Sequence, residues 1–78
     1  MSAADDVRSL IAATLKLPID KITPTTRYGD FAAWDSLGQV NLIMALEQTF
    51  DVYIEAEEFA DLNSVAAIVT FLEARGIR

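Results

Sequence analysis

The chain alternates between segments with helical hydrophobic spacing and segments rich in proline, glycine and polar residues. Near the N-terminus, four apolar residues follow the i, i+3, i+4, i+8 spacing of one helix face: Val7, Leu10, Ile11 and Leu15. Ser2, followed three residues later by Asp5, forms a capping-box pattern before this face. We therefore predict a first helix over residues 3–15.

A long connection follows, from Lys16 to about Trp34. Pro18, Pro24 and Gly29 interrupt any helical pattern in this stretch. Connections of this length in small domains are usually functional or are held by their own apolar residues. Four such residues are available as anchors: Ile19, Ile22, Tyr28 and Phe31.

The next segment, from Asp35 or Ser36 to Phe50, lacks proline and predicts a second helix with two apolar rows. One row consists of Leu37, Val40 and Met44. The other lies roughly 130 to 140° away around the helix and consists of Leu42, Ile43, Leu46 and Phe50. A small bundle needs one row for its core. The other is either covered by the long connection or exposed to a partner, and the pattern favours neither.

Two further helices complete the predicted fold. A short one extends from about Ala56 to Ala60, with Phe59 facing inward, and a last one extends from a cap at Asn63 or Ser64 to about Ala74. The apolar face of the last helix contains Val65, Ile68, Val69 and Leu72. Residues 52–54 have strand propensity but no second strand to pair with. We predict an all-α fold, a small four-helix bundle forming a single domain over residues 1–78.

Composition and charge narrow the possible functions. The 78 residues include neither Cys nor His, which excludes disulfides, Cys or His nucleophiles and imidazole metal ligands. The net charge is -6, and residues 28–74 contain nine acidic residues and neither Lys nor Arg. Such a surface argues against nucleic acid and anionic membranes and favours partners with basic patches. Acidic Asp5 and Asp6 argue against a signal peptide, and we expect a cytoplasmic location.

No catalytic or metal site is predicted. Ser36 lacks the flanking glycines of a nucleophile elbow, and no base is available to activate it. The acidic residues of the 55–61 segment lack the spacing of an EF-hand loop, so a solvated acidic face is the better interpretation. We expect that the protein is not an enzyme and that it binds no metal.

Ser36 at the head of the second helix has two interpretations. With Gln39 three residues later it forms a capping-box pattern, which favours a purely structural cap. Alternatively the hydroxyl is modified. A phosphate ester on Ser36 would lie in the favourable field of a helix N-terminus, and Asp35 would take over the cap.

One segment starts with Asp35-Ser36-Leu37 and continues through Val40, Leu42, residues 44–47 and residues 50–51. This segment resembles the region around the prosthetic-group serine of acyl carrier proteins. The resemblance extends over nearly the whole chain, because the Leu15-Lys16-Leu17 end of the first helix and the acidic segment 56–59 fall in the family's order and spacing. It implies that a phosphopantetheinyl transferase attaches 4'-phosphopantetheine to Ser36, flanked by Asp35 and Leu37. An acyl-loading ligase or synthase would then use the arm.

The resemblance also identifies candidate partner-binding residues, namely Val40, Met44, Glu47, Glu55, Glu57 and Glu58. Two features depart from the family pattern. Residues 31–34 read Phe-Ala-Ala-Trp, where the family often has Leu-Gly-Ala or Leu-Gly-Gly, and Trp34 is expected to anchor the loop in the core or to contact a dedicated partner. In addition, Glu47 is the only acid within the second helix, whereas carriers for fatty-acid synthesis tend to have several.

These observations favour a monomeric, specialised acyl carrier. A carrier of an aminoacyl or peptidyl group is the nearest alternative. A small acidic helical adaptor without a prosthetic group is an alternative from a different class.

Overall fold

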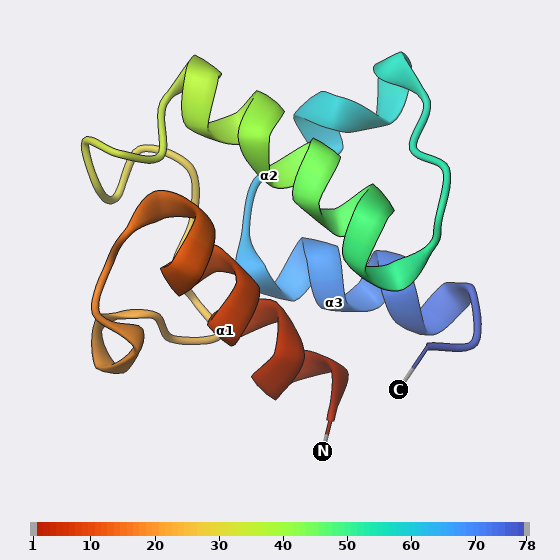
Figure 1. Ribbon diagram of the computed structural model, residues 1–78, viewed down its shortest axis with the longest axis horizontal. Coiled ribbons are helices and arrows are strands. Elements are labelled where there is room, and N and C mark those ends of the chain that lie inside the picture. The colour runs from red at the N-terminus through yellow and green to blue at the C-terminus, as the bar shows by residue number, and fades with distance from the viewer. Residues whose placement is uncertain (1, 78) are drawn as a thin grey trace.

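The computed structural model describes residues 2–77, which form three α-helices and two 3-10 helices (Figure 1). In chain order these are α1 (Ala3–Leu15), the 3-10 helix η1 (Ile19–Lys21), α2 (Ser36–Phe50), the 3-10 helix η2 (Ala56–Asp61) and α3 (Val65–Ala74). Within residues 2–77 there is no strand, only an isolated bridge between Arg27 and Ser64. The prediction of an all-α bundle of four helices is confirmed by α1, α2, η2 and α3, and η1 is an additional single turn in the long connection.

Helix α1 begins at the predicted cap, where the Ser2 hydroxyl accepts a hydrogen bond from the Asp5 amide at 3.2 Å. It ends at Lys16, whose left-handed conformation (φ 58°) lets its amide bond back to Ala12. The buried face packs against both α2 and α3, and it contains Ala3, Val7, Ile11 and Leu15. The helix therefore closes one side of the core that the other two α-helices share.

The two apolar rows of α2 differ in burial. Leu42, Ile43 and Leu46 are buried in the core, whereas Leu37 and Met44 are 69% and 49% exposed. Val40 is exposed beside them. Because the long connection leaves this second row uncovered, its three side chains form an exposed apolar row along α2.

The long connection is held by a buried apolar residue and by an arginine. Ile22 is fully buried, and the Arg8 side chain of α1 donates to the carbonyl oxygens of Ile22 (2.7 Å) and Ile19 (3.2 Å). Phe31 packs against the edge of the core. The expectation that Ile19 and Tyr28 also anchor the loop is wrong, because both are exposed. The Ile19 carbonyl oxygen is instead held by its hydrogen bond from Arg8. The Tyr28 hydroxyl forms a hydrogen bond with Ser36.

Trp34 is fully buried at the end of this connection, as one of its two expected roles required. In contrast, Phe50 is only partly buried, although it belongs to the same apolar row as the buried Leu46. Phe50 is the last residue of α2 and lines a shallow groove beside Leu10 of α1, so its ring has solvent on one side. Burial of α2 is thus deepest in its middle.

Helix α3 supplies the rest of the core. The Ser64 hydroxyl accepts a hydrogen bond from the Ala67 amide at 3.0 Å and caps the helix, so Ser64 is the cap of the two that the sequence offered. Val65, Ile68 and Leu72 are buried and Val69 is half-buried. Phe71 is buried as well, because the Arg75 guanidinium covers its ring at 3.6 Å from the centroid.

Within the part of the chain that the structure describes, no helix is long and apolar enough to cross a membrane.

The two rows of α2 lead to a stability test with a matched pair of variants. Leu46→Ala removes a side chain that is 1% exposed, so it should lower the free energy of unfolding by about 2–5 kcal/mol. Met44→Ala, two residues away on the exposed row, should change it by less than about 0.5 kcal/mol. Urea unfolding followed by circular dichroism measures both, and an equal loss in the two variants would contradict this assignment of the rows.

Candidate functional site

The start of α2 is capped by Asp35, and this leaves Ser36 free. The Asp35 carboxylate accepts a hydrogen bond from the Gly38 amide at 2.9 Å, and Ser36 is the first helical residue. Of the two interpretations of Ser36, the Ser36–Gln39 capping box is wrong, because Asp35 occupies the cap position and Gln39 bonds elsewhere. Ser36 is exposed, so its hydroxyl is available for chemistry without loss of the cap.

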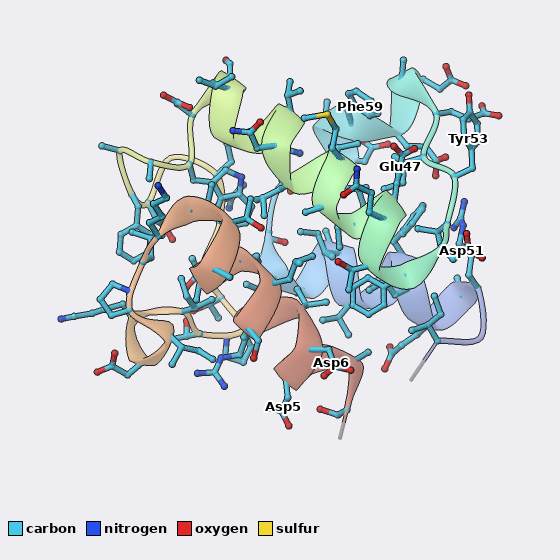
Figure 2. All side chains as sticks on the ribbon, viewed as in Figure 1. Asp5, Asp6, Glu47, Asp51, Tyr53 and Phe59 are labelled. Atoms are coloured by element: carbon cyan, nitrogen blue, oxygen red, sulfur yellow. The ribbon has the colours of Figure 1, made fainter. Side chains whose placement is uncertain are left out.

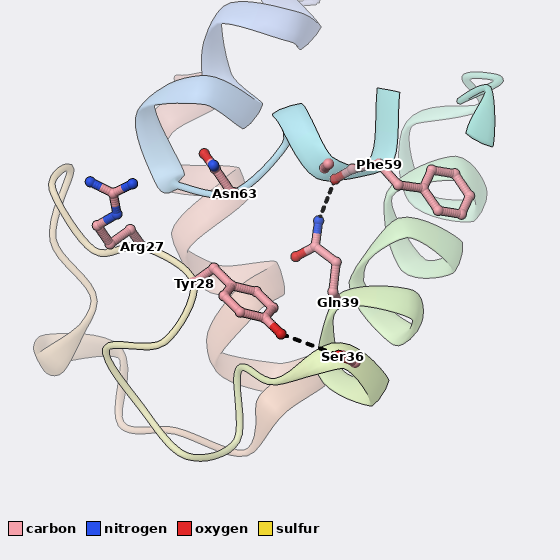
Figure 3. Close-up of a pocket in the computed structure, with 7 residues that line it drawn as sticks. Arg27, Tyr28, Ser36, Gln39, Phe59 and Asn63 are labelled. Atoms are coloured by element: carbon pink, nitrogen blue, oxygen red, sulfur yellow. Dashed lines mark hydrogen bonds between the residues drawn. The ribbon is translucent and has the colours of Figure 1, made fainter. Parts of the chain in front are cut away.

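One side chain contacts that hydroxyl. The phenolic oxygen of Tyr28, from the long connection, lies 3.2 Å from Ser36 Oγ, and the two hydroxyls form a hydrogen bond (Figure 3). Nothing in the sequence pattern of Tyr28 indicated this contact, since the residues are eight positions apart and the connection has no regular geometry. The fold thus brings a polar group of the loop to the head of α2.

Gln39 joins the loop, α2 and η2 through one amide group. Its Oε1 accepts from the indole N–H of the buried Trp34 at 2.7 Å. Its Nε2 donates to the carbonyl oxygens of Phe59 (2.8 Å, Figure 3) and Leu62 (2.9 Å). With three bonds the side chain is fixed in one orientation, and it holds η2 next to the first turn of α2.

Gly38 lets the loop lie against the helix. A Cβ atom at this position would collide with the backbone oxygen of Ala33 and press on the Leu15 side chain. The glycine therefore serves a close approach of two backbone segments rather than an unusual backbone angle. This approach fixes the position of the loop that precedes Ser36.

Beside Ser36 lies an open pocket of about 430 Å³ between the loop, α2 and η2 (Figure 3). It is lined by side chains from all three segments and from the chain just before α3: Arg27, Tyr28, Ser36, Gln39, Phe59, Ala60 and Asn63. A group attached to Ser36 would have this space next to it. Phosphate at Ser36 would also meet the positive end of the α2 macrodipole, so the site is suited to a phosphate-linked arm.

The predicted partner-binding residues lie in two places. Leu37 follows Ser36 directly and continues into the exposed row with Val40 and Met44. Glu47, near the other end of α2 (Figure 2), is half-buried, and its Oε2 accepts from the Ile54 amide at 3.0 Å. This glutamate therefore holds the turn after α2, a role that the sequence pattern did not indicate.

The three other predicted acidic residues lie at the start of η2. The Glu55 carboxyl shares a hydrogen bond with Glu57, and this bond, with a smaller desolvation effect and the charge of Glu58, raises the pKa of Glu55. The same bond lowers the pKa of Glu57. Glu58 is partly engaged, since it accepts from the Glu55 amide at 3.3 Å and lies 3.5 Å from Arg75. Within residues 2–77, no group of three or more carboxylates is arranged to hold a metal ion.

Comparison with known proteins agrees with this geometry. Residues 5–72 match the profile of a family described as "Phosphopantetheine attachment site". One relative, an acyl carrier protein of Akkermansia muciniphila, is 38% identical over 72 residues, which cover 92% of this chain and 90% of the relative. Another, an acyl carrier protein of Helicobacter hepaticus, is 30% identical over 74 residues, covering 95% and 97%.

The small helical bundle is consistent with the fold of a carrier domain. The match over most of the chain shows which class of carrier this is: the chain belongs to the phosphopantetheine attachment-site family. Its prosthetic group is accordingly 4'-phosphopantetheine. The chain itself has no Cys, so the thiol on which such a carrier depends is supplied by that group.

The Gln39 amide provides a test of the site's architecture. Gln39→Glu would place a carboxylate against the Phe59 and Leu62 carbonyl oxygens, which then lose their donor. We expect the free energy of unfolding to fall by about 1–3 kcal/mol and Trp34 fluorescence to change.

The matched control is Gln48→Glu, the same substitution at an exposed position of α2, which should change stability by less than about 0.5 kcal/mol. Equal melting temperatures for the two variants would show that the Gln39 bonds do not hold η2 in place.

Proposed function

We propose that this protein carries an acyl group as a thioester on a 4'-phosphopantetheine arm attached to Ser36 and presents it to partner enzymes. The observation that carries the proposal is the exposed Ser36 hydroxyl, left free because Asp35 caps α2. The family match and the acyl carrier proteins among the relatives support the acyl role.

In this proposal the chain acts as a carrier and catalyses nothing. A phosphopantetheinyl transferase loads Ser36, and acyl-processing enzymes act on the arm. The residues of the chain hold the attachment serine at the head of a rigid helix and present the surface around it. We further propose that residues 1–78 act as one domain, as a monomer, in the cytoplasm.

The surface offered to partners is apolar along α2 and acidic at η2. We propose that Leu37, Val40 and Met44 form the apolar contact and that Glu55 and Glu57 supply the main charge. Glu47 and Glu58 add charge to the same surface while holding the Ile54 amide and Arg75. Charges of this kind accelerate encounter and fix orientation more than they add affinity.

Loading of the protein tests the attachment site. Incubation with coenzyme A and a promiscuous phosphopantetheinyl transferase should add the mass of one phosphopantetheine to the wild-type protein and nothing to Ser36→Ala. Because Asp35 caps α2, the free energy of unfolding of Ser36→Ala should lie within about 0.5 kcal/mol of the wild-type value.

Ser64→Ala is the control, because it removes a structural serine and keeps Ser36. It removes the α3 cap, so it should cost about 1 kcal/mol and still gain the full mass. Mass gain by Ser36→Ala would refute the assignment of the serine.

The sparse charge of α2 provides a second test, of specialisation. We expect a fatty-acid synthase system, adapted to carriers with several acids on this helix, to use the protein poorly. Asn41→Glu with Gln48→Glu adds two exposed acids to α2 and should raise turnover in a manner that salt suppresses. Turnover is compared with that of the system's own carrier. Equal use of the unmutated protein would contradict the specialisation.

A further inference from the structure

Tyr28 is the residue near Ser36 whose role the proposed function does not use. Its side chain is 42% exposed, so it contributes little to the core. Its hydroxyl nevertheless lies 3.2 Å from Ser36 Oγ (Figure 3). An exposed aromatic residue that directs its one polar atom at the candidate attachment oxygen needs an explanation other than packing.

The backbone around Tyr28 is fixed on both sides. The Tyr28 amide donates to the Asn63 carbonyl at 2.7 Å, and the Gly29 amide donates to the Trp34 carbonyl at 3.2 Å. Gly29 has a positive φ of 90°, which is costly for other residues and permits the turn that follows the tyrosine. These bonds hold Tyr28 between the segment before α3 and the start of α2.

We propose that Tyr28 is a positioning residue for the prosthetic group: its hydroxyl holds the Ser36 hydroxyl before loading and donates to the phosphodiester after loading. This inference rests on the proposed attachment at Ser36. After loading, Ser36 Oγ becomes an ester oxygen and the adjacent non-bridging oxygens share one negative charge. A hydrogen bond to such an oxygen is charge-assisted and stronger than the bond between two neutral hydroxyls.

Asp35, the residue before Ser36, cannot play this part. The Asp35 side chain is an acceptor engaged with the Gly38 amide, and when ionised it repels a phosphodiester. The phenolic O–H is thus a neutral donor that offsets part of this repulsion. The bond would restrain the first atoms of the arm beside the pocket, on the side where Tyr28 and Gln39 line it.

Phosphorus NMR of the loaded protein tests the proposal. Tyr28→Phe removes the hydroxyl and keeps the ring. Relative to the loaded wild type, its ³¹P signal should shift and become narrower, because the phosphodiester loses a partner and moves more freely. Tyr53→Phe, at the chain's other tyrosine, which is 74% exposed, is the matched control and should leave the signal unchanged.

A second measurement requires no variant. In the loaded wild type, nuclear Overhauser contacts should connect the Tyr28 ring protons with the first methylene of the arm. A ³¹P signal in Tyr28→Phe identical to that of the wild type, or the absence of these contacts, would overturn the role of Tyr28. If the wild type is loaded, that result leaves the attachment at Ser36 intact. If the wild type gains no mass with coenzyme A and a transferase, both proposals fail.

Discussion

The burial of Trp34 imposes the constraint on which the site depends. Its indole is fully buried, and the single N–H of a buried indole needs an acceptor. Gln39 supplies that acceptor, and the rest of its amide then binds the Phe59 and Leu62 carbonyl oxygens. The buried Trp34 side chain, through its bond to Gln39, thereby fixes the end of the loop, the first turn of α2 and the position of η2. These are the three segments that surround Ser36 and the pocket beside it.

This arrangement explains how a domain with a thin core presents a well-placed hydroxyl. Asp35 caps the helix, so the Ser36 hydroxyl next to it is not needed for the cap. Gly38 lets Ala33 of the loop lie against the helix, and the Tyr28 hydroxyl of the same loop contacts Ser36. The rigidity of the site comes from backbone contacts and one amide network, and the serine itself can be modified without weakening any of them.

Features set by neighbouring residues could be predicted from the sequence, whereas contacts that depend on the folded chain could not. Helix bounds, the Ser2 cap and the two apolar rows of α2 follow from local spacing, and the structure confirms them. Spacing left open whether the Leu37 row is covered, and the structure shows that it is exposed. The bonds of Gln39 to Phe59 and Leu62 join positions 20 and 23 residues apart. The bonds of Trp34 and Tyr28 depend on the geometry of an irregular loop. Sequence spacing instead suggested a local capping box for Ser36 and Gln39, because it cannot rank two adjacent capping residues such as Asp35 and Ser36. The contact of the Tyr28 hydroxyl with Ser36 was likewise not predicted, because the sequence pattern indicated Tyr28 only as an apolar anchor of the loop.

The acidic residues also differ in what the sequence and the structure reveal about them. The sequence identifies an acidic surface, but only the structure separates acids that hold the fold from acids free to act on a partner. Glu47 restrains the turn at Ile54, and Glu58 lies against Arg75. Glu55 and Glu57 contact each other, and their shared hydrogen bond moves the pKa of Glu55 up and that of Glu57 down. An approaching basic patch would favour the ionised form of both carboxyls, because a nearby positive charge lowers the pKa of an acid.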